Sequence, residues 1–168
     1  WTYSINPRES QTFTRNFSLI PTFQSVKIDN IYYDFDKATL RPESKAGLDA
    51  LIAMMNENPN ITIEMSAHTD YKGKDEYNRD LSARRAQSVI DYLIAAGIDA
   101  ARLTAVGYGE IKPFVVDAIT AQQFTFLPTG TRLTQEYILT LTPDEQEICN
   151  QINRRTEFII LSTTFNMY

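Results

Sequence analysis

The chain has 168 residues, 43% hydrophobic and 22% charged, which is typical of a soluble globular domain and excludes a disordered or membrane-spanning protein. Its net charge of −5 argues against nucleic acid as a partner, because binding a polyanion needs clustered Lys and Arg. The single cysteine, Cys149, excludes an internal disulfide and a multi-cysteine metal site.

The first 24 residues carry scattered aromatic side chains and no sustained hydrophobic period. We interpret residues 1–24 as a linker or the tail of a preceding domain, and residues 25–168 as one domain. A chain that begins with Trp1 instead of Met is expected to be a fragment or a processed form.

A strand and a helix are expected first within this domain. Hydrophobic residues between 26 and 33 predict the strand, and a loop follows at 34–37. Pro42 suits the first turn of a helix, and Pro59 ends it. The apolar residues of this helix recur at helical spacing: Leu48, Leu51, Ile52 and Met55.

A second strand and a long helix follow. Residues 61–67 alternate between apolar and polar, which predicts a strand with one face in water. The helix is expected over residues 75–96. Residues 103–106 predict a third, short strand. The Gly-Tyr-Gly at 107–109 lacks the G-x-G-x-x-G spacing of a phosphate loop, and we interpret it as a tight turn.

The segment 114–141 is too apolar for a free loop, and long structureless loops are uncommon in compact domains. We predict an ordered flap with a short helix near 135–139 that starts at Thr134. Its expected role is stability or shaping of a partner surface, without direct ligand contact. A capping box then starts a helix at Thr142, and residues 158–161 form the last strand.

The order of elements is thus β-α-β-α-β-(insert)-α-β. This order predicts an α/β fold, an α+β sandwich in which the helices pack on one mixed sheet.

A basic residue lies on the apolar face of the long helix. At about 100° per residue, Arg85 and Asn78 fall within the apolar stripe, whereas Arg84 falls outside it. A buried guanidinium must find an anion, because an unpaired buried charge is costly. Asp70, at the end of the preceding strand, is one candidate, which would make a structural salt bridge. A ligand carboxylate is the other. The stripe consists of Leu81, Val89, Tyr92, Leu93 and Ala96.

His68 is the only histidine and has no partner for nucleophilic catalysis, so we expect a hydrogen-bonded histidine at a strand end. Cys149 lies on the apolar side of its predicted helix and is expected to be a small core residue.

The combined motifs resemble the OmpA C-terminal domain family, which includes peptidoglycan-associated lipoproteins and flagellar stator proteins. The resemblance covers roughly residues 26–162. It rests on Asp34-Phe35-Asp36, His68-Thr69-Asp70, Gly73, Asn78, Leu81-Ser82, Arg85-Ala86, Tyr92-Leu93, Gly97, Arg102-Leu103, Gly107-Tyr108-Gly109, Pro113 and Asn153-Arg154-Arg155.

The resemblance implies non-catalytic binding of peptidoglycan through the diaminopimelate residue of the stem peptide, with no cofactor and no metal. Asp70 would take the ligand ammonium and Arg85 its carboxylate, with Asn78 and Arg154 nearby. The remaining residues that the family places at the site are Phe35, Asp36 and Leu81. Strand alternation sends Arg154 and Arg155 to opposite faces, so at most one joins Arg85.

The resemblance also implies a periplasmic location, with a tether to the outer membrane through another part of the protein. The segment between Pro113 and Asn153 is longer than the family's usual connection. It resembles insertions in OmpA-type domains of Bacteroidetes envelope proteins, such as the PorE component associated with type IX secretion. Other envelope or secretion-complex proteins are therefore expected partners.

Two other function classes stay open. One is a cell-wall hydrolase that uses Asp36 and Asp70 as its two carboxylates. A general acid needs a raised pKa, however, and Arg85 beside Asp70 would lower the pKa of that carboxyl. The other is a purely structural module for assembly or dimerisation.

Overall fold

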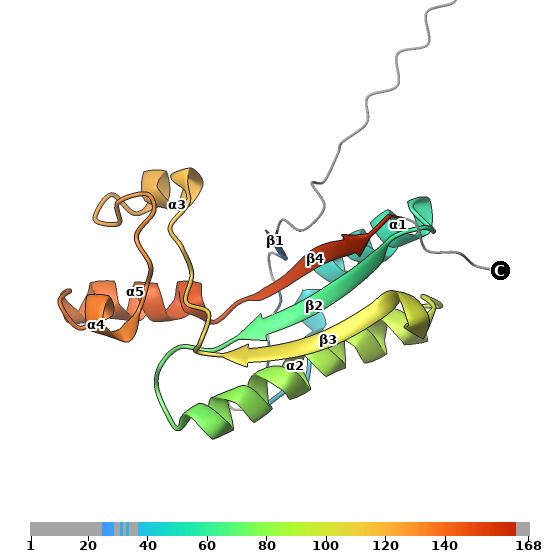
Figure 1. The fold of residues 1–168 in the computed structure, drawn as a ribbon, viewed down its shortest axis with the longest axis horizontal. Coiled ribbons are helices and arrows are strands. Elements are labelled where there is room, and N and C mark those ends of the chain that lie inside the picture. The colour runs from blue at the N-terminus through green and yellow to red at the C-terminus, as the bar shows by residue number, and fades with distance from the viewer. Residues whose placement is uncertain (1–24, 29–30, 32, 34–36, 164–168) are drawn as a thin grey trace, which may run out of the picture.

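The computed structural model describes residues 25–28, 31, 33 and 37–163 (Figure 1). Within them a four-stranded sheet has the order β1-β4-β2-β3. β2 and β3 are parallel, and β4 is antiparallel to both β1 and β2, so the predicted mixed sheet is confirmed. The strands are β1 (Ser25–Lys27), β2 (Thr62–His68), β3 (Leu103–Gly109) and β4 (Thr156–Ser162).

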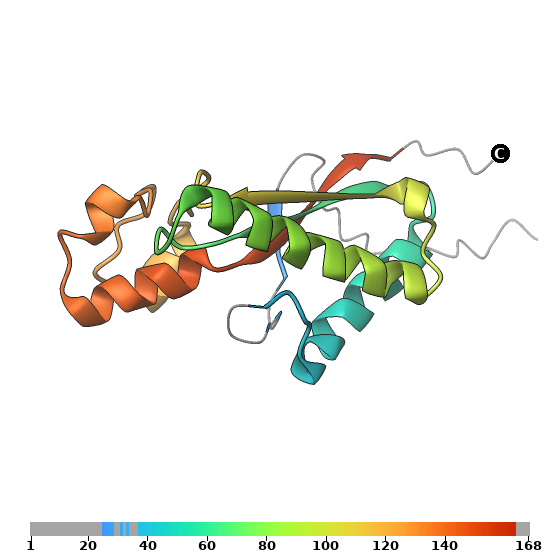
Figure 2. The ribbon, with the colours of Figure 1, turned by 90° about the horizontal axis from the view of Figure 1, so that it is seen from below.

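Two helices cover one face of this sheet (Figures 1 and 2). They are α1 (Lys45–Glu57), which follows the short 3-10 helix η1 (Pro42–Ser44), and α2 (Asp75–Ala95). Inward-facing apolar side chains of β2 and β4 meet those of the two helices and form the main hydrophobic core. Its most buried members include Leu48, Met55, Ile63, Met65, Val89, Leu93, Phe158 and Ile160.

The first strand is shorter than predicted. Among the described residues Ser25–Lys27 form the strand that pairs with β4, and the Ile28 N–H also donates to the Thr156 carbonyl, whereas Tyr33 makes an isolated antiparallel bridge with Leu40. Tyr33 is therefore free of the sheet and can contribute its side chain elsewhere.

The interpretation of residues 107–109 as a tight turn was wrong, because they continue β3. A Cβ atom added at Gly107 would lie 2.1 Å from the backbone nitrogen of Ala83, so glycine here lets α2 approach the strand. Ser82 secures this approach by accepting a 2.8 Å hydrogen bond from the Gly109 N–H. The close approach also buries Ala86 on α2, outside the predicted stripe, while Ala96 lies exposed just beyond the helix end.

A buried arginine joins α1 to the sheet at the end where β2 begins. Arg102, in the 3-10 helix η2 (Ala100–Arg102), donates hydrogen bonds of 2.8–2.9 Å to the carbonyls of Met55, Asn58 and Ile61. Its guanidinium thus satisfies backbone acceptors at the C-terminal end of α1.

The insertion is ordered, as predicted, and packs with the last helix at the end of the sheet where β2 and β3 finish (Figure 1). Its helices are α3 (Ala118–Gln123) and α4 (Gln135–Ile138), and the last helix is α5 (Pro143–Asn153). The Thr134 cap of α4 and the capping box of α5 are confirmed. α3 was not predicted, although its cap Asp117 precedes several good helix formers. The buried centre of this second core is Val116, Leu127, Leu133, Ile138 and Cys149.

Candidate functional site

The loop between β2 and α2 presents a buried carboxylate. Asp70 is the second residue after the end of β2, and its Oδ1 accepts a 3.0 Å hydrogen bond from the Lys72 N–H. The Asn78 side-chain amide lies within 3.3 Å of the Asp70 and Lys72 carbonyls and donates a 2.8 Å hydrogen bond to Glu110. Asn78 therefore holds the loop that carries Asp70 against the first turns of α2.

A second element brings the cation that pairs with Asp70. Arg154 lies at the C-terminal end of α5. One of its terminal N–H groups donates a hydrogen bond to Asp70, and the other donates a 2.6 Å hydrogen bond to Glu147. Glu147 also accepts a 3.1 Å hydrogen bond from Lys72. These side-chain hydrogen bonds, from Arg154 first and then Lys72, lower the pKa of Glu147 below its usual value.

Arg85 reaches the same region from α2, as its position in the helix predicts. Its Nε donates a 3.0 Å hydrogen bond to the Lys37 carbonyl, and its guanidinium carbon lies 4.9 Å from the ring centre of Tyr33. Burial raises the pKa of Tyr33 to about 12, so this ring stays neutral. Arg84 instead points to solvent and pairs with Asp80 at 2.9 Å.

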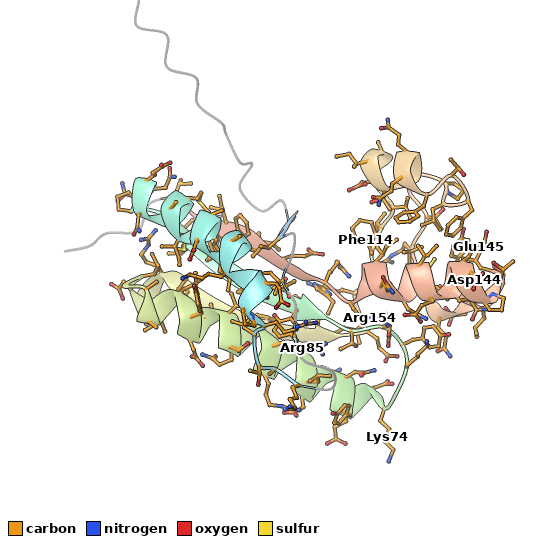
Figure 3. The ribbon with its side chains drawn as sticks, turned by 180° about the vertical axis from the view of Figure 1, so that it is seen from behind. Lys74, Arg85, Phe114, Asp144, Glu145 and Arg154 are labelled. Carbon is orange, nitrogen blue, oxygen red and sulfur yellow. The ribbon has the colours of Figure 1, made fainter. Side chains whose placement is uncertain are left out.

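These groups face one open cavity of about 650 Å³. Its charged lining combines two carboxylates with three cations, and Tyr33, Tyr77 and Leu81 supply apolar surface. Figure 3 shows Arg85 and Arg154 approaching this region from α2 and from the junction of α5 with β4. The full lining is Tyr33, Thr69, Asp70, Lys72, Tyr77, Asn78, Leu81, Arg85, Glu147 and Arg154.

Five of the seven predicted site residues line this cavity: Asp70, Asn78, Leu81, Arg85 and Arg154. The other two, Phe35 and Asp36, lie outside the described residues. The sequence indicated only Arg85 as a salt-bridge partner of Asp70, whereas the structure pairs Asp70 with Arg154.

The sequence did not indicate Tyr33, Lys72 or Glu147 as residues of the cavity. One available signal was the spacing of Glu147 and Arg154, seven residues apart, which places them on the same side of a helix two turns apart. Tyr33 gave no comparable signal, because its contacts with Arg85 and Thr156 are long-range.

Arg155 contacts β4 and the backbone beside it. It pairs with Glu157 and donates to the carbonyls of Lys112 and Asn153. The 650 Å³ cavity is lined by Arg154 and not by Arg155, although both arginines line a smaller adjacent cavity of about 180 Å³ together with Arg85.

His68 departs from its prediction. It is a buried residue at the end of β2, but neither ring nitrogen has a hydrogen-bond partner among the described residues. The ring instead stacks on Tyr108 at 5.4 Å. Burial first, and then the positive charges of Arg155 and Lys112, lower the pKa of His68 to about 3. The strand-end position is confirmed, whereas the expected hydrogen bond is not found among the described residues, where a carboxylate oxygen of Glu157 lies 4.0 Å from Nε2.

In the described part of the chain, no three or more His, Cys, Asp or Glu side chains gather where they could hold a metal ion. None of the helices among the described residues has the length and apolar character needed to cross a membrane. Charges of both signs therefore line a partly apolar cavity. This arrangement suits a ligand that carries both an ammonium and a carboxylate.

Several known proteins are similar to this chain. Outer membrane porin F of Pseudomonas fluorescens is 38% identical over 102 residues, which are 60% of this chain and 31% of that protein. Outer membrane protein A of Escherichia coli O157:H7 is 45% identical over 86 residues, which are 50% of this chain and 25% of that protein. The chain therefore spans less than a third of the length of these two relatives.

Solved structures share the fold at lower identity. The peptidoglycan-associated lipoprotein from Burkholderia pseudomallei matches with a TM-score of 0.55 and 22% identity, covering 77% of this chain and 87% of that chain. The cell wall anchor of the T6SS from Pseudomonas aeruginosa matches with a TM-score of 0.54 and 21% identity, covering 82% and 79%. A family model described as the OmpA family matches residues 32–124, more than half of the sequence. The chain belongs to the OmpA family.

Proposed function

We propose that this domain binds peptidoglycan non-covalently, through the free amino-acid end of diaminopimelate, and so anchors an envelope protein to the cell wall. The observation that carries the proposal is the single cavity in which Asp70 lies with Arg85 and Arg154. The names of two similar structures, a peptidoglycan-associated lipoprotein and a cell wall anchor, support the same class of ligand.

The ligand chemistry matches the lining of the cavity. The free end of diaminopimelate carries an ammonium and a carboxylate on one carbon, so its recognition needs a fixed anion and a fixed cation close together. In this proposal Asp70 receives the ammonium, and Arg85 binds the carboxylate with its planar fork of donors. The aliphatic part of the ligand lies along Leu81 and Tyr77, while Asn78 keeps the Asp70 loop in place.

The proposal includes the cellular setting. The anchored protein acts in the periplasm and is tethered to the outer membrane, and it belongs to an envelope assembly such as a secretion complex. Two relatives with outer-membrane names support the envelope setting.

Purified sacculi test the proposal and separate it from the other function classes. We expect the domain to pellet with diaminopimelate-type sacculi without releasing soluble fragments. Released fragments would instead indicate a hydrolase, and failure to pellet would indicate an assembly module.

Among the carboxylates of the cavity, Glu147 has a lowered pKa, the opposite of what a general acid needs.

Calorimetry with soluble stem peptides tests the chemical specificity. Replacing diaminopimelate by lysine removes the terminal carboxylate and leaves Arg85 without its bidentate partner, which is expected to cost about 1–3 kcal/mol. Equal affinity for the two peptides would contradict recognition of the amino-acid end.

A further inference from the structure

The carboxylate proposed to receive the ligand ammonium already has a cation bound to it. Arg154 pairs with Oδ2 of Asp70, while Oδ1 is bound by the Lys72 backbone N–H. The Asp70 side chain is 10% exposed, whereas that of Arg154 is 35% exposed. The carboxylate that an incoming ammonium meets therefore has two partners, a backbone N–H and the partly exposed side chain of Arg154, and the side chain is the one that can be displaced.

Arg154 has a second anion that stays with it. Its other terminal nitrogen binds Glu147, two helix turns earlier on α5, and Lys72 binds the second oxygen of the same carboxylate. Leaving Asp70 would thus not strand the guanidinium without a counter-ion. The bridge from Asp70 through Arg154 and Glu147 to Lys72 also ties the β2–α2 loop to α5.

We propose that Arg154 is an exchangeable counter-ion of Asp70 that makes the site select ligands with both an ammonium and a carboxylate over ligands with an ammonium alone. This inference rests on the proposed function and assigns the source of its specificity. Glu147 is a positioning residue that keeps Arg154 within the cavity when the ligand takes its place on Asp70.

The selectivity follows from the charge that each ligand brings. A ligand with only an ammonium displaces Arg154 from Asp70, so the Asp70–ammonium contact merely replaces the Asp70–Arg154 contact. The ligand also adds a positive charge beside the displaced guanidinium. A ligand with both groups also brings a carboxylate, which Arg85 and the displaced Arg154 share in the same cavity. The added positive charge is then balanced by an added negative charge, so only this ligand avoids the repulsion.

The test compares two soluble stem peptides, one ending in diaminopimelate and one in lysine, against the unmodified domain and Arg154→Gln. Calorimetry should show that Arg154→Gln weakens binding of the diaminopimelate peptide and leaves binding of the lysine peptide unchanged or tighter. The preference between the two peptides should fall about tenfold. Arg154→Lys keeps the positive charge without the fork and should retain part of the preference.

The ratio of the two affinities is the readout that a merely structural role would not move. Equal weakening of both peptides by Arg154→Gln, or an unchanged ratio, would overturn the inference while leaving the proposed function intact. Failure of the unmodified domain to bind either peptide would overturn both. Circular dichroism confirms that each variant is folded.

Glu147→Gln tests the positioning role. Without this carboxylate Asp70 becomes the main anion for Arg154, so the arginine is harder to displace and both peptides should bind several-fold more weakly. Asp144→Asn is the matched control, because Asp144 is an exposed carboxylate at the opposite end of α5 from Arg154 (Figure 3). If the two variants bind alike, Glu147 does not position Arg154.

Discussion

Asp80 and Arg84, on the outer side of α2, are a matched control pair for Asp70 in the β2–α2 loop and Arg85 on α2. Asp80 and Arg84 form an exposed pair on α2, whereas Asp70 is buried and Arg85 is half-buried beside the cavity. Position relative to the cavity, and not charge alone, therefore distinguishes the two sets.

We predict that Asp70→Ala and Arg85→Ala each weaken binding to sacculi by about thirty-fold or more, because losing one partner of a desolvated charge interaction costs about 2 kcal/mol or more. Asp80→Ala and Arg84→Ala should bind nearly as the unmodified domain does. Pelleting with sacculi measures the effect, and thermal melting shows whether each variant stays folded. A loss caused by Arg84→Ala would contradict the assignment of the binding face.

His68 should make the stability of the domain depend on mildly acidic pH. Its pKa is about 3 in the fold and about 6.5 in an unfolded chain, so the unfolded state binds the extra proton between these values. Stability is therefore complete above pH 6.5 and falls as the pH drops toward 3. Between pH 7 and pH 5 we expect a loss of about 2 kcal/mol in the free energy of unfolding.

Urea unfolding of His68→Phe checks this expectation, since phenylalanine keeps the stack on Tyr108 but cannot titrate. The chain has one histidine, and the carboxylates with lowered pKa values, Glu136, Glu145 and Glu147, act only at lower pH. The variant should therefore show a flat stability between pH 7 and pH 5. A slope equal to that of the unmodified domain would assign the dependence to another group.

At the scale of elements, the contact between α2 and β3 depends on the absence of one side chain. A Cβ at Gly107 would lie 2.1 and 2.5 Å from backbone atoms of Ala83, and no change of rotamer can relieve a clash with backbone. We predict that Gly107→Ala lowers the free energy of unfolding by about 1–3 kcal/mol or more, as overpacking does. Urea unfolding measures the loss, with Thr104→Ala, at an exposed position of the same strand, as the control.

The same variant should weaken ligand binding, because Ala83 lies between Asn78 and Arg85 on α2. A helix that moves away from β3 displaces both side chains from the cavity. Unchanged stability of Gly107→Ala would show that α2 tolerates the shift.

The second hydrophobic core supports the site by holding α5 in place. Asn153, the last residue of α5, joins this helix to the insertion by accepting from the Phe114 N–H at 2.9 Å and donating to the Leu133 carbonyl at 2.8 Å. This core thereby holds α5, which carries Glu147. The insertion 114–141 contributes no residue to the lining of the 650 Å³ cavity, which agrees with its expected indirect role.

Two adjacent residues of the insertion separate packing from binding. Ile138 is fully buried, whereas the next residue, Leu139, is 56% exposed. Ile138→Ala should destabilise the domain by about 2–5 kcal/mol, and Leu139→Ala should be nearly neutral. Both should still pellet with sacculi at a temperature where they are folded. Loss of binding by folded Ile138→Ala would place the insertion in direct control of the site.

At the scale of the whole molecule, a ligand that binds only the folded state must stabilise it. The site joins the β2–α2 loop, α2 and α5, so unfolding any of them destroys it. At a peptide concentration of about 100 times Kd, the free energy of unfolding should rise by about 2.7 kcal/mol, and the melting temperature by about 5–10 °C. Differential scanning calorimetry with the diaminopimelate peptide measures this shift.

Arg84→Ala should show the full shift in melting temperature, and Asp70→Ala should show none. A shift of equal size in Asp70→Ala would mean that the peptide binds elsewhere on the fold.

The sequence by itself determined the order of the elements and the facing of α2, because helical and strand periods depend on residues only a few positions apart. The start of α4 at Thr134 and the capping box of α5 followed from local chemistry in the same way. The direction of Arg85 also needed only the helical period. His68 and the Gly-Tyr-Gly of β3 were interpreted wrongly, because their roles depend on Tyr108 and Ala83, which meet them through packing.

Only the tertiary structure decided which charges meet. Asp70 and Arg154 are 84 residues apart, and the sequence pattern indicated only Asp70 or a ligand carboxylate as the anion for Arg85. The pairing depends on where the second core places α5 against the β2–α2 loop. Long-range electrostatic partners follow from the packing of whole elements, which no local period encodes, and here that packing selects Arg154 for Asp70 and Glu147 for Arg154.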